Sequence, residues 1–445
     1  MAHRPRRPAT GMLTTVLTLV VLLFALLAGG LWIGLSLAIT GSLLLALFRD
    51  MPLFKLIPQQ AWNILTTQEL LALPLFILMG EILFRTRLSQ ALFSGVAPWA
   101  GLLPGRLLHV NVVGCSIFAA ISGSSAATTQ VVGRISIAEL TRRGYSKSIV
   151  VGSLAGAGTL GFLIPPSNIM IIYGVLGDVS IVKLFTAGLI PGLLLAGAFS
   201  AWIMVHTTLV PELVPERERA LAHATAAERL ASLKELGPAL FLIACVLGSM
   251  YGGLATPSES AAVGVAGALL IAALQGSLSL SGLRDIAIGA VLTCSMIAMI
   301  LLGAFILGVS LAFLGVPAAI AAWVKSLGLS PVALMLALVA FYLVLGCLLD
   351  GFSMIVMTLP IVLPIVKAAG FDEVWFGVFL VLVVEMAQVT PPVGFNLFVI
   401  QGLTEESIGY IARVTLPYLA IMAAFTMLLT AFPEIALWLP KAIAK

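Results

Sequence analysis

The chain has 445 residues, of which 61% are hydrophobic and only 9% are charged. A soluble globular protein carries about 25% charged residues, so the composition excludes a soluble enzyme or binding module and predicts an all-α polytopic membrane protein. The formal net charge of +4 at pH 7 is small and spread along the chain, so nothing indicates a nucleic-acid partner.

Apolar segments close to the length of a membrane span, about 20 residues, follow one another along the first half of the chain. We expect spans at roughly 12–28, 31–48, 70–86 and 184–208, a hairpin at 110–138 and a broken helix at 149–176. The first segment is interpreted as a retained span because no small-residue cleavage site in a polar context follows it.

A charged linker is expected at 209–237, with five acidic residues, four basic residues and two prolines. Beyond it we expect spans near 238–254, 257–274, 296–312 and 410–434, an interrupted pair at 332–366 and a broken helix at 375–402. Shorter amphipathic stretches at 58–67, 88–103 and 315–328 are expected to lie flat at the membrane surface.

Two interruptions of the apolar pattern mark the first half. Ser122-Gly123-Ser124-Ser125 divides one apolar run, which predicts a re-entrant hairpin with a small, hydroxyl-rich tip. Pro165-Pro166 divides the next run, which predicts a helix broken near its middle. Non-helical backbone at membrane depth is tolerated only where it is buried in protein or faces a wet cavity. The paired breaks therefore predict a solute or ion site, as in secondary transporters.

The same features recur at one offset in the second half. Pro165-Pro166 recurs as Pro391-Pro392 and Pro191 recurs as Pro417, each 226 residues later (391 minus 165, and 417 minus 191). Moving the Ser122–Ser125 tip by this offset lands on the polar break that contains Asp350 and Gly351. We infer an internal duplication with a first repeat at 1–208 and a second at 238–445.

Each repeat holds five spans and one hairpin, and an odd number of spans predicts that the repeats are inverted. The flanks of the first hairpin are rich in arginine, whereas those of the second are balanced in charge. By the positive-inside tendency the first hairpin opens to the cytoplasm and the second to the outside. The same counting places the basic N-terminus outside, so 12–48 crosses the membrane only once or a partner subunit overrides the rule.

Helix breaks can hold sodium because they free backbone carbonyls, which nearby hydroxyls supplement. The first half offers the Ser122–Ser125 tip against Gly161 to Pro166. The second half offers Gly346 to Gly351 against Ala387 to Gly394, with the hydroxyl of Thr390. In the alternative interpretation, small residues and prolines only let helices pack and bend. Four breaks related by one offset favour the ion site.

An anionic substrate suits the same region, because each half-helix that follows a proline pair begins there with free N–H groups. Ser167 and Asn168 are expected as donors. Asp350 could hydrogen-bond substrate hydroxyls, bind a cation or cap the following helix. Glu81 and Glu385 lie in apolar runs away from the breaks, so we assign them structural hydrogen bonds or interfacial positions.

Other classes of function find little support. The tip serines have no histidine or lysine nearby in sequence, and neither a zinc-protease motif nor a phosphate-binding loop occurs. An intramembrane hydrolase and a simple channel remain remote alternatives. We therefore expect no enzyme activity and no organic cofactor.

The chain resembles the large membrane subunit of the tripartite ATP-independent periplasmic (TRAP) transporters over almost its whole length. The resemblance is carried by four stretches: Ile121-Ser122-Gly123-Ser124-Ser125, Arg143-Gly144-Tyr145, Ile164-Pro165-Pro166-Ser167 and Val389-Thr390-Pro391-Pro392-Val393-Gly394. It implies a multi-pass protein of the bacterial inner membrane and sodium-driven uptake of an organic anion. It also implies a soluble periplasmic binding protein, a separate four-helix membrane subunit and an elevator motion.

Carried onto this sequence, the resemblance implies three groups of site residues. One sodium site uses Ala119, Ser122, Gly161, Ile164 and Pro166; a second uses Gly346, Ala387, Thr390 and Val393; and the substrate lies near Ser124, Ser167, Asn168 and Asp350. Ala387 departs from the family pattern, because many relatives have glycine there. The alternative is a sodium–carboxylate symporter that needs no binding protein.

Overall fold

The computed structural model describes residues 11–49, 53–86, 88–220, 224–347, 349–392 and 394–443. Within these ranges the secondary structure is entirely helical, as the composition predicts. Among the described residues, six helices are long and apolar enough to cross a membrane: α10 (Ile181–Leu209), α12 (Ala226–Tyr251), α13 (Pro257–Leu274), α14 (Leu280–Leu314), α17 (Gly351–Ala368) and α20 (Ile408–Ala431).

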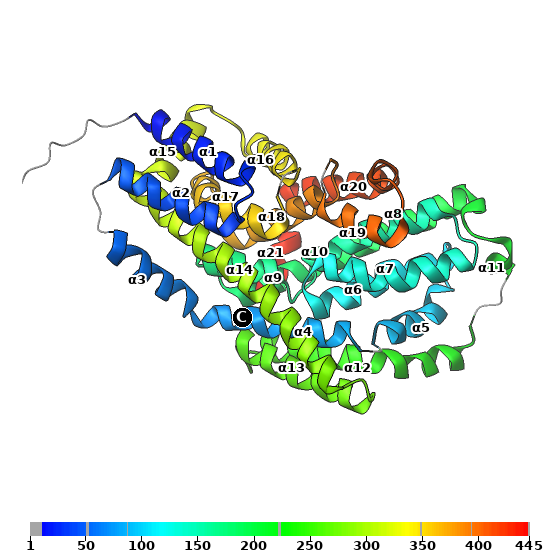
Figure 1. Cartoon of the computed structure of the whole chain (residues 1–445). Coiled ribbons are helices and arrows are strands. Elements are labelled where there is room, and N and C mark those ends of the chain that lie inside the picture. Colours follow the sequence, from blue (N-terminus) through cyan, green and yellow to red (C-terminus); the bar gives the residue numbers. More distant parts are fainter. Residues whose placement is uncertain are drawn as a thin grey trace, which may run out of the picture.

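An outer group of helices forms one side of the molecule (Figure 1). Its members are α1 (Met12–Ala28), α2 (Ile33–Phe48), α4 (Ala72–Phe84), α12, α13 and α14. The long helix α14 packs along α2 and α4, and α13 packs along α4 and α12. Gly34 and Gly303 lie at the contact between α2 and α14, where a Cβ atom on Gly34 would lie 2.9 Å from the backbone nitrogen of Ile300. Small residues thus let these backbones approach closely.

Two helical hairpins and two broken helices form an inner group, which we call the hairpin–break core. The hairpins are α6 (His109–Ser122) with α7 (Ser125–Arg142), and α16 (Pro331–Gly346) with α17. The broken helices are α8 (Lys147–Gly158) with α9 (Asn168–Gly177), and α18 (Glu373–Gln388) with α19 (Phe395–Thr404). The interruptions fall where the sequence predicts them.

Helices at equivalent positions in the two halves pack on equivalent helices of the opposite half. Adding 226 to the bounds of α7 gives the bounds of α17. Helix α7 packs on α19 as α17 packs on α9, and α8 packs on α20 as α18 packs on α10. In the outer group α14 packs on α2 as α13 packs on α4. The hairpin–break core is therefore built from contacts between the two halves.

Two predicted boundaries are wrong. The charged linker is shorter than 209–237, because α12 begins at Ala226, where Thr225 and Glu228 form a capping box. The span expected at 296–312 belongs to the 35-residue helix α14, which begins at Leu280 and includes the charged residues Arg284 and Asp285.

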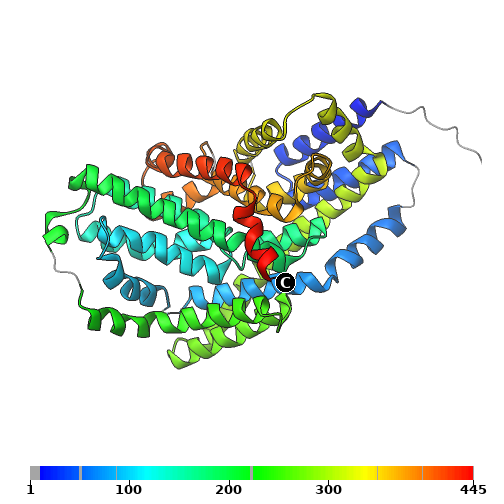
Figure 2. The same ribbon diagram turned by 180° about the vertical axis from the view of Figure 1, so that it is seen from behind.

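Short helices occupy the predicted amphipathic stretches and the end of the chain. They are α3 (Leu53–Leu65), α5 (Leu88–Ala100) and α15 (Val316–Ser326). The last helix, α21 (Glu434–Ile443), packs against α10, so the chain ends near the middle of the molecule (Figure 2). This brings the end of the second half against the last long helix of the first.

Candidate functional site

The tip of the first hairpin is a tight turn built by glycine and serine. Helix α6 ends at Ser122, and Gly123 after it adopts the left-handed conformation (φ +58°) that favours glycine and donates to the carbonyl of Ala119 at 3.0 Å. Ser124 caps the start of α7, where its hydroxyl accepts a bond from the N–H of Ala127 at 3.4 Å. The Ser122 hydroxyl lies 3.1 Å from that of Thr128.

The first broken helix stops one turn before its prolines. The N–H groups of Leu163 and Ile164 both bond to the carbonyl of Leu160, at 3.2 and 3.0 Å. Pro165 and Pro166 have no N–H to extend the helix. Helix α9 then begins afresh, with the Ser167 hydroxyl accepting from the N–H of Met170 at 3.3 Å.

The hairpin tip is docked onto this break. The Asn168 N–H donates to the carbonyl of Gly123 at 3.2 Å, and the Asn168 amide donates to the carbonyl of Ser122 at 3.3 Å. A Cβ atom on Gly161 would lie 2.6 Å from the Ser125 nitrogen. The structure thus brings the hairpin part of the predicted first sodium site, which includes Ala119, against its break part, which includes Ile164 and Pro166.

The second hairpin approaches the second break in the same way. A Cβ atom on Gly346 would meet the side chain of Ala387 and lie 3.1 Å from its Cα. Thr390 donates its hydroxyl to the carbonyl of Met386 at 2.7 Å and its N–H to the carbonyl of Ala387 at 3.2 Å. Val393 lies outside the described residues.

The alanine at position 387 lies opposite a glycine of the second hairpin. Ala387 is 226 residues after Gly161, so the two occupy equivalent positions in the broken helices. In the first half the glycine is on the broken helix, against Ser125 of the hairpin. In the second half the hairpin supplies the glycine, Gly346, and the methyl group of Ala387 fills the space opposite.

Asp350 caps the helix that follows the second tip. One carboxylate oxygen accepts from the N–H groups of Phe352 at 3.0 Å and Ser353 at 3.4 Å, and the other accepts from the Ser353 hydroxyl. The side chain is half-buried. Of the three roles considered for Asp350, the structure contains the contacts of the cap.

The two halves meet between the residues predicted to bind the substrate. A Cβ atom on Gly351 would lie 3.1 Å from the side chain of Ile169, the residue after Asn168. The rings of Phe162 and Phe352 pack edge to face, with centroids 5.3 Å apart. The start of α9 and the start of α17 are therefore neighbours, which brings Ser167 and Asp350 into one region.

Glu385 belongs to the first break, and its assignment away from the breaks is wrong. Its side chain is fully buried on α18. The same carboxylate oxygen accepts from the Ser125 hydroxyl and from the N–H of Phe162, the latter at 3.1 Å. The predicted structural hydrogen bonding is correct, but the bonds join the hairpin tip to the broken helix.

Asn396, on α19, is a second polar residue that sequence reasoning missed. It is fully buried, and in the part of the chain that the structure describes neither its amide nitrogen nor its amide oxygen has a hydrogen-bond partner. A signal was present in the sequence, because each proline pair is followed within a few residues by an asparagine, Asn168 or Asn396.

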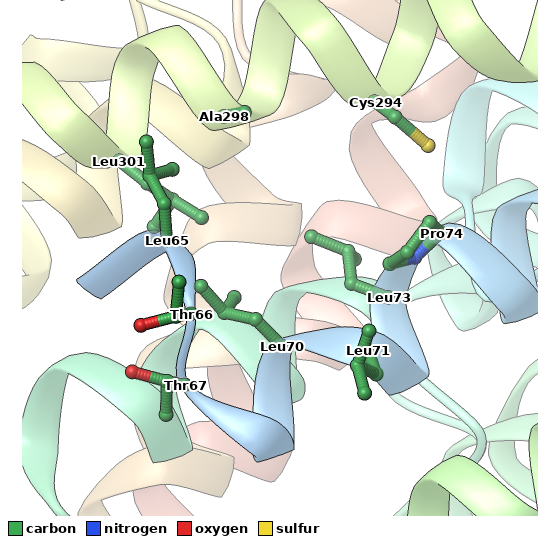
Figure 3. A pocket seen from close by; sticks show the side chains of 10 residues that line it. All are labelled: Leu65, Thr66, Thr67, Leu70, Leu71, Leu73, Pro74, Cys294, Ala298 and Leu301. Carbon is green, nitrogen blue, oxygen red and sulfur yellow. The ribbon is translucent and has the colours of Figure 1, made fainter. Parts of the chain in front are cut away.

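A cavity of about 230 Å³ lies outside the core, between α14 and the segment from Leu65 to Pro74 (Figure 3). Five of its ten lining residues are leucine, and Cys294 and Ala298 lie on the α14 side. No hairpin or break residue lines it, so the cavity plays no part in the site described above.

Comparison with known proteins identifies the family. Residues 20–435 match the model of the tripartite ATP-independent periplasmic transporter, DctM component. The chain is 33% identical over 410 residues to the C4-dicarboxylate TRAP transporter large permease protein DctM of Pseudomonas aeruginosa, covering 91% of this chain and 94% of that protein. It is 29% identical over 373 residues to the sialic acid TRAP transporter large permease protein SiaM of Vibrio cholerae, covering 84% and 86%.

The fold is also similar to a solved transporter structure. The YdaH transporter of Alcanivorax borkumensis superposes with a TM-score of 0.58 and 14% sequence identity, covering 86% of this chain and 88% of that one. At this identity the likeness concerns the fold alone.

Proposed function

The chain belongs to the family of DctM components of tripartite ATP-independent periplasmic transporters, and we propose that it is a permease that couples sodium entry to the uptake of a small organic anion. The observation that carries the proposal is the docking of the first hairpin tip onto the first break through Asn168, Gly123 and Ser122. This docking gathers backbone carbonyls and hydroxyls in one buried place, which suits a hard, weakly bound cation.

Two sodium ions are proposed, one at each hairpin and break. The first is held by groups of Ala119, Ser122, Gly161, Ile164 and Pro166, and the second by groups of Gly346, Ala387, Thr390 and Val393. The equivalent packing of α7 on α19 and α17 on α9 supports two related sites.

The substrate is proposed to bind between the two ions, near Ser124, Ser167, Asn168 and Asp350. Helix α9 begins there, and the N–H groups and positive dipole end of a helix N-terminus favour a carboxylate. Relatives are named for C4-dicarboxylates and for sialic acid, so we infer a carboxylate such as a C4-dicarboxylate, a keto acid or a sugar acid.

Two partners are proposed in the bacterial inner membrane and the periplasm. The first is a separate small membrane subunit with four helices. A relative named isethionate TRAP transporter permease protein DctMQ is matched over only 63% of its length, which leaves room in that protein for a second subunit. The other partner is a periplasmic protein that delivers the substrate.

Movement is proposed to follow the division between the two groups of helices. The hairpin–break core would slide as one block against the outer helices, because its members are tied to each other by contacts that cross between the halves. Such an elevator motion exposes one central site to each side of the membrane in turn.

The partners separate this proposal from its alternative. Uptake is measured in vesicles with the permease alone, with the small subunit added, and with the substrate-loaded binding protein added. We expect uptake only when all three proteins are present. Uptake by the permease alone would favour a symporter that takes its substrate directly from solution.

A further inference from the structure

Glu385 is a buried acid whose two oxygens have unequal surroundings. One oxygen accepts hydrogen bonds from Ser125 and from the N–H of Phe162. The other is buried and has no hydrogen-bond partner among the described residues. No lysine, arginine or histidine among the described residues forms an ion pair with Glu385.

An ionised carboxylate in such a place requires a compensating positive charge, because an unpaired buried ion is costly. The groups that Glu385 contacts indicate where the positive charge belongs. Ser125 is the last residue of the hairpin tip, and Phe162 directly follows Gly161. Both segments supply groups to the proposed first sodium site. The five residues proposed to bind that ion are themselves all uncharged.

We propose that Glu385 is a positioning residue for the first sodium site, supplying its negative charge and holding its two halves in register. This inference rests on the proposed sodium coupling. A carboxylate just outside a coordination shell fixes the groups that bind the ion and raises its affinity. Because Glu385 lies on α18, the second half of the chain sets the sodium affinity of a site built by the first.

The equivalent position in the first half lacks this arrangement. Residue 159, which lies 226 positions before Glu385, is a threonine whose hydroxyl donates to the carbonyl of Gly156, three residues earlier, at 2.6 Å. We therefore assign the charged support to the first site only, and we expect the two sodium ions to bind with different affinities.

The test is a sodium titration of the purified permease. The unfolding temperature is measured at each sodium concentration, and potassium chloride keeps the ionic strength constant. Glu385→Gln preserves an oxygen that can accept both hydrogen bonds but removes the charge. We expect it to raise the sodium concentration for half-maximal stabilisation of the affected site about tenfold. Ser125→Ala keeps the charge and removes one bond, and we expect an increase of about threefold.

Glu373→Gln is the matched control, because Glu373 is a half-exposed acid of the same helix, paired with Lys367 at 2.8 Å. It should leave the sodium response unchanged. If Glu385 has only a structural role, Glu385→Gln will lower the unfolding temperature in potassium chloride without changing the half-maximal sodium concentration. That result would overturn the inference. If Glu385→Gln does not fold, the Ser125→Ala variant provides the test. An unchanged half-maximal sodium concentration in that variant would then overturn the inference.

The wild-type titration separates this inference from the proposed function. A wild-type protein that sodium stabilises no more than potassium does would contradict the proposed function itself. A sodium-specific wild-type response that is unchanged in the Glu385→Gln and Ser125→Ala variants would contradict only the role of Glu385.

Discussion

The carboxylate of Glu385 accepts a hydrogen bond from the hydroxyl of Ser125, a residue 260 positions earlier in the chain. The contact joins the second broken helix to the tip of the first hairpin. Together with the bond from Phe162, it makes the first break a structure shared by both halves. A change in either half is therefore expected to affect sodium binding in the other.

Removing the amide of Asn168 should loosen the first hairpin tip. Asn168→Ala loses the bond to the Ser122 carbonyl, which is worth about 1 kcal/mol. We expect sodium-driven uptake to fall about tenfold, because the tip no longer holds its carbonyls against the break. Uptake by reconstituted vesicles is the measurement. Asn63→Ala, at an exposed position on α3, is the control, and equal uptake by both variants would contradict the docking role of Asn168.

Adding a methyl group at Gly161 should separate the hairpin from the break. The new Cβ atom would lie 2.6 Å from the Ser125 nitrogen, which is backbone and cannot rotate away. We expect Gly161→Ala to lower the unfolding temperature and to abolish uptake. Gly402→Ala on α19 is the matched control, because nothing lies within 4 Å of its added Cβ and alanine favours the helix. A Gly161→Ala variant with wild-type uptake would show that the close approach is not needed.

Asp350 combines a cap with a proposed substrate contact, and two substitutions separate them. Asn is as good an N-cap as Asp, so Asp350→Asn should keep the unfolding temperature and lower uptake at least about tenfold, on the order of 1.4 kcal/mol. Asp350→Ala should lower both quantities.

Asp372 provides the control for this pair. It caps α18 by accepting from the N–H groups of Val374 at 2.8 Å and Trp375 at 2.9 Å, and it lies away from the hairpin tips. Asp372→Asn should therefore transport normally. If Asp350→Asn also transports at the wild-type rate, Asp350 acts only as a cap.

Glu139 should make stability depend on pH at the end of the first hairpin. It accepts from Arg143 at 2.7 Å and Arg142 at 2.6 Å, and these bonds hold the pKa of its carboxyl below the ordinary value of 4.5. A lowered pKa stabilises the folded protein above that ordinary value, and the stabilisation is lost as the pH falls through the folded-state pKa.

The measurement compares the unfolding temperature of Glu139→Gln with that of the wild type. We expect the variant to be less stable at pH 7 by about 1 kcal/mol or less, because the pair is partly solvated. The difference should shrink as the pH falls below about 4.5. A difference that is the same at pH 7 and at pH 3.5 would show that the charge of Glu139 contributes nothing.

Local signals in the sequence predicted the breaks, whereas contacts between distant residues could not be predicted from it. Pro165-Pro166 and Pro391-Pro392 end helices because each proline lacks a backbone N–H, which is a property of the residue itself. Glu385 carries no such local signal, since its hydrogen-bond partners lie in the first half of the chain. Inside an apolar run it has the pattern of any buried acid, and only the packing of α18 places it at the first break.

The boundary errors have local causes. The capping box of Thr225 and Glu228 can be recognised in the sequence, but the charges around it indicate a solvated linker. In α14, Arg284 and Asp285 interrupt the apolar pattern without interrupting the helix, because charged residues are good or tolerable helix formers. Hydropathy therefore locates apolar segments better than it locates helix ends.

The most direct test of the central claim is the initial rate of uptake into vesicles that contain the permease and the small subunit, with loaded binding protein outside. An inward sodium gradient is compared with an equal potassium gradient. We predict rapid uptake with sodium and none above background with potassium. Equal rates with the two ions would contradict the claim that the hairpins and breaks hold sodium.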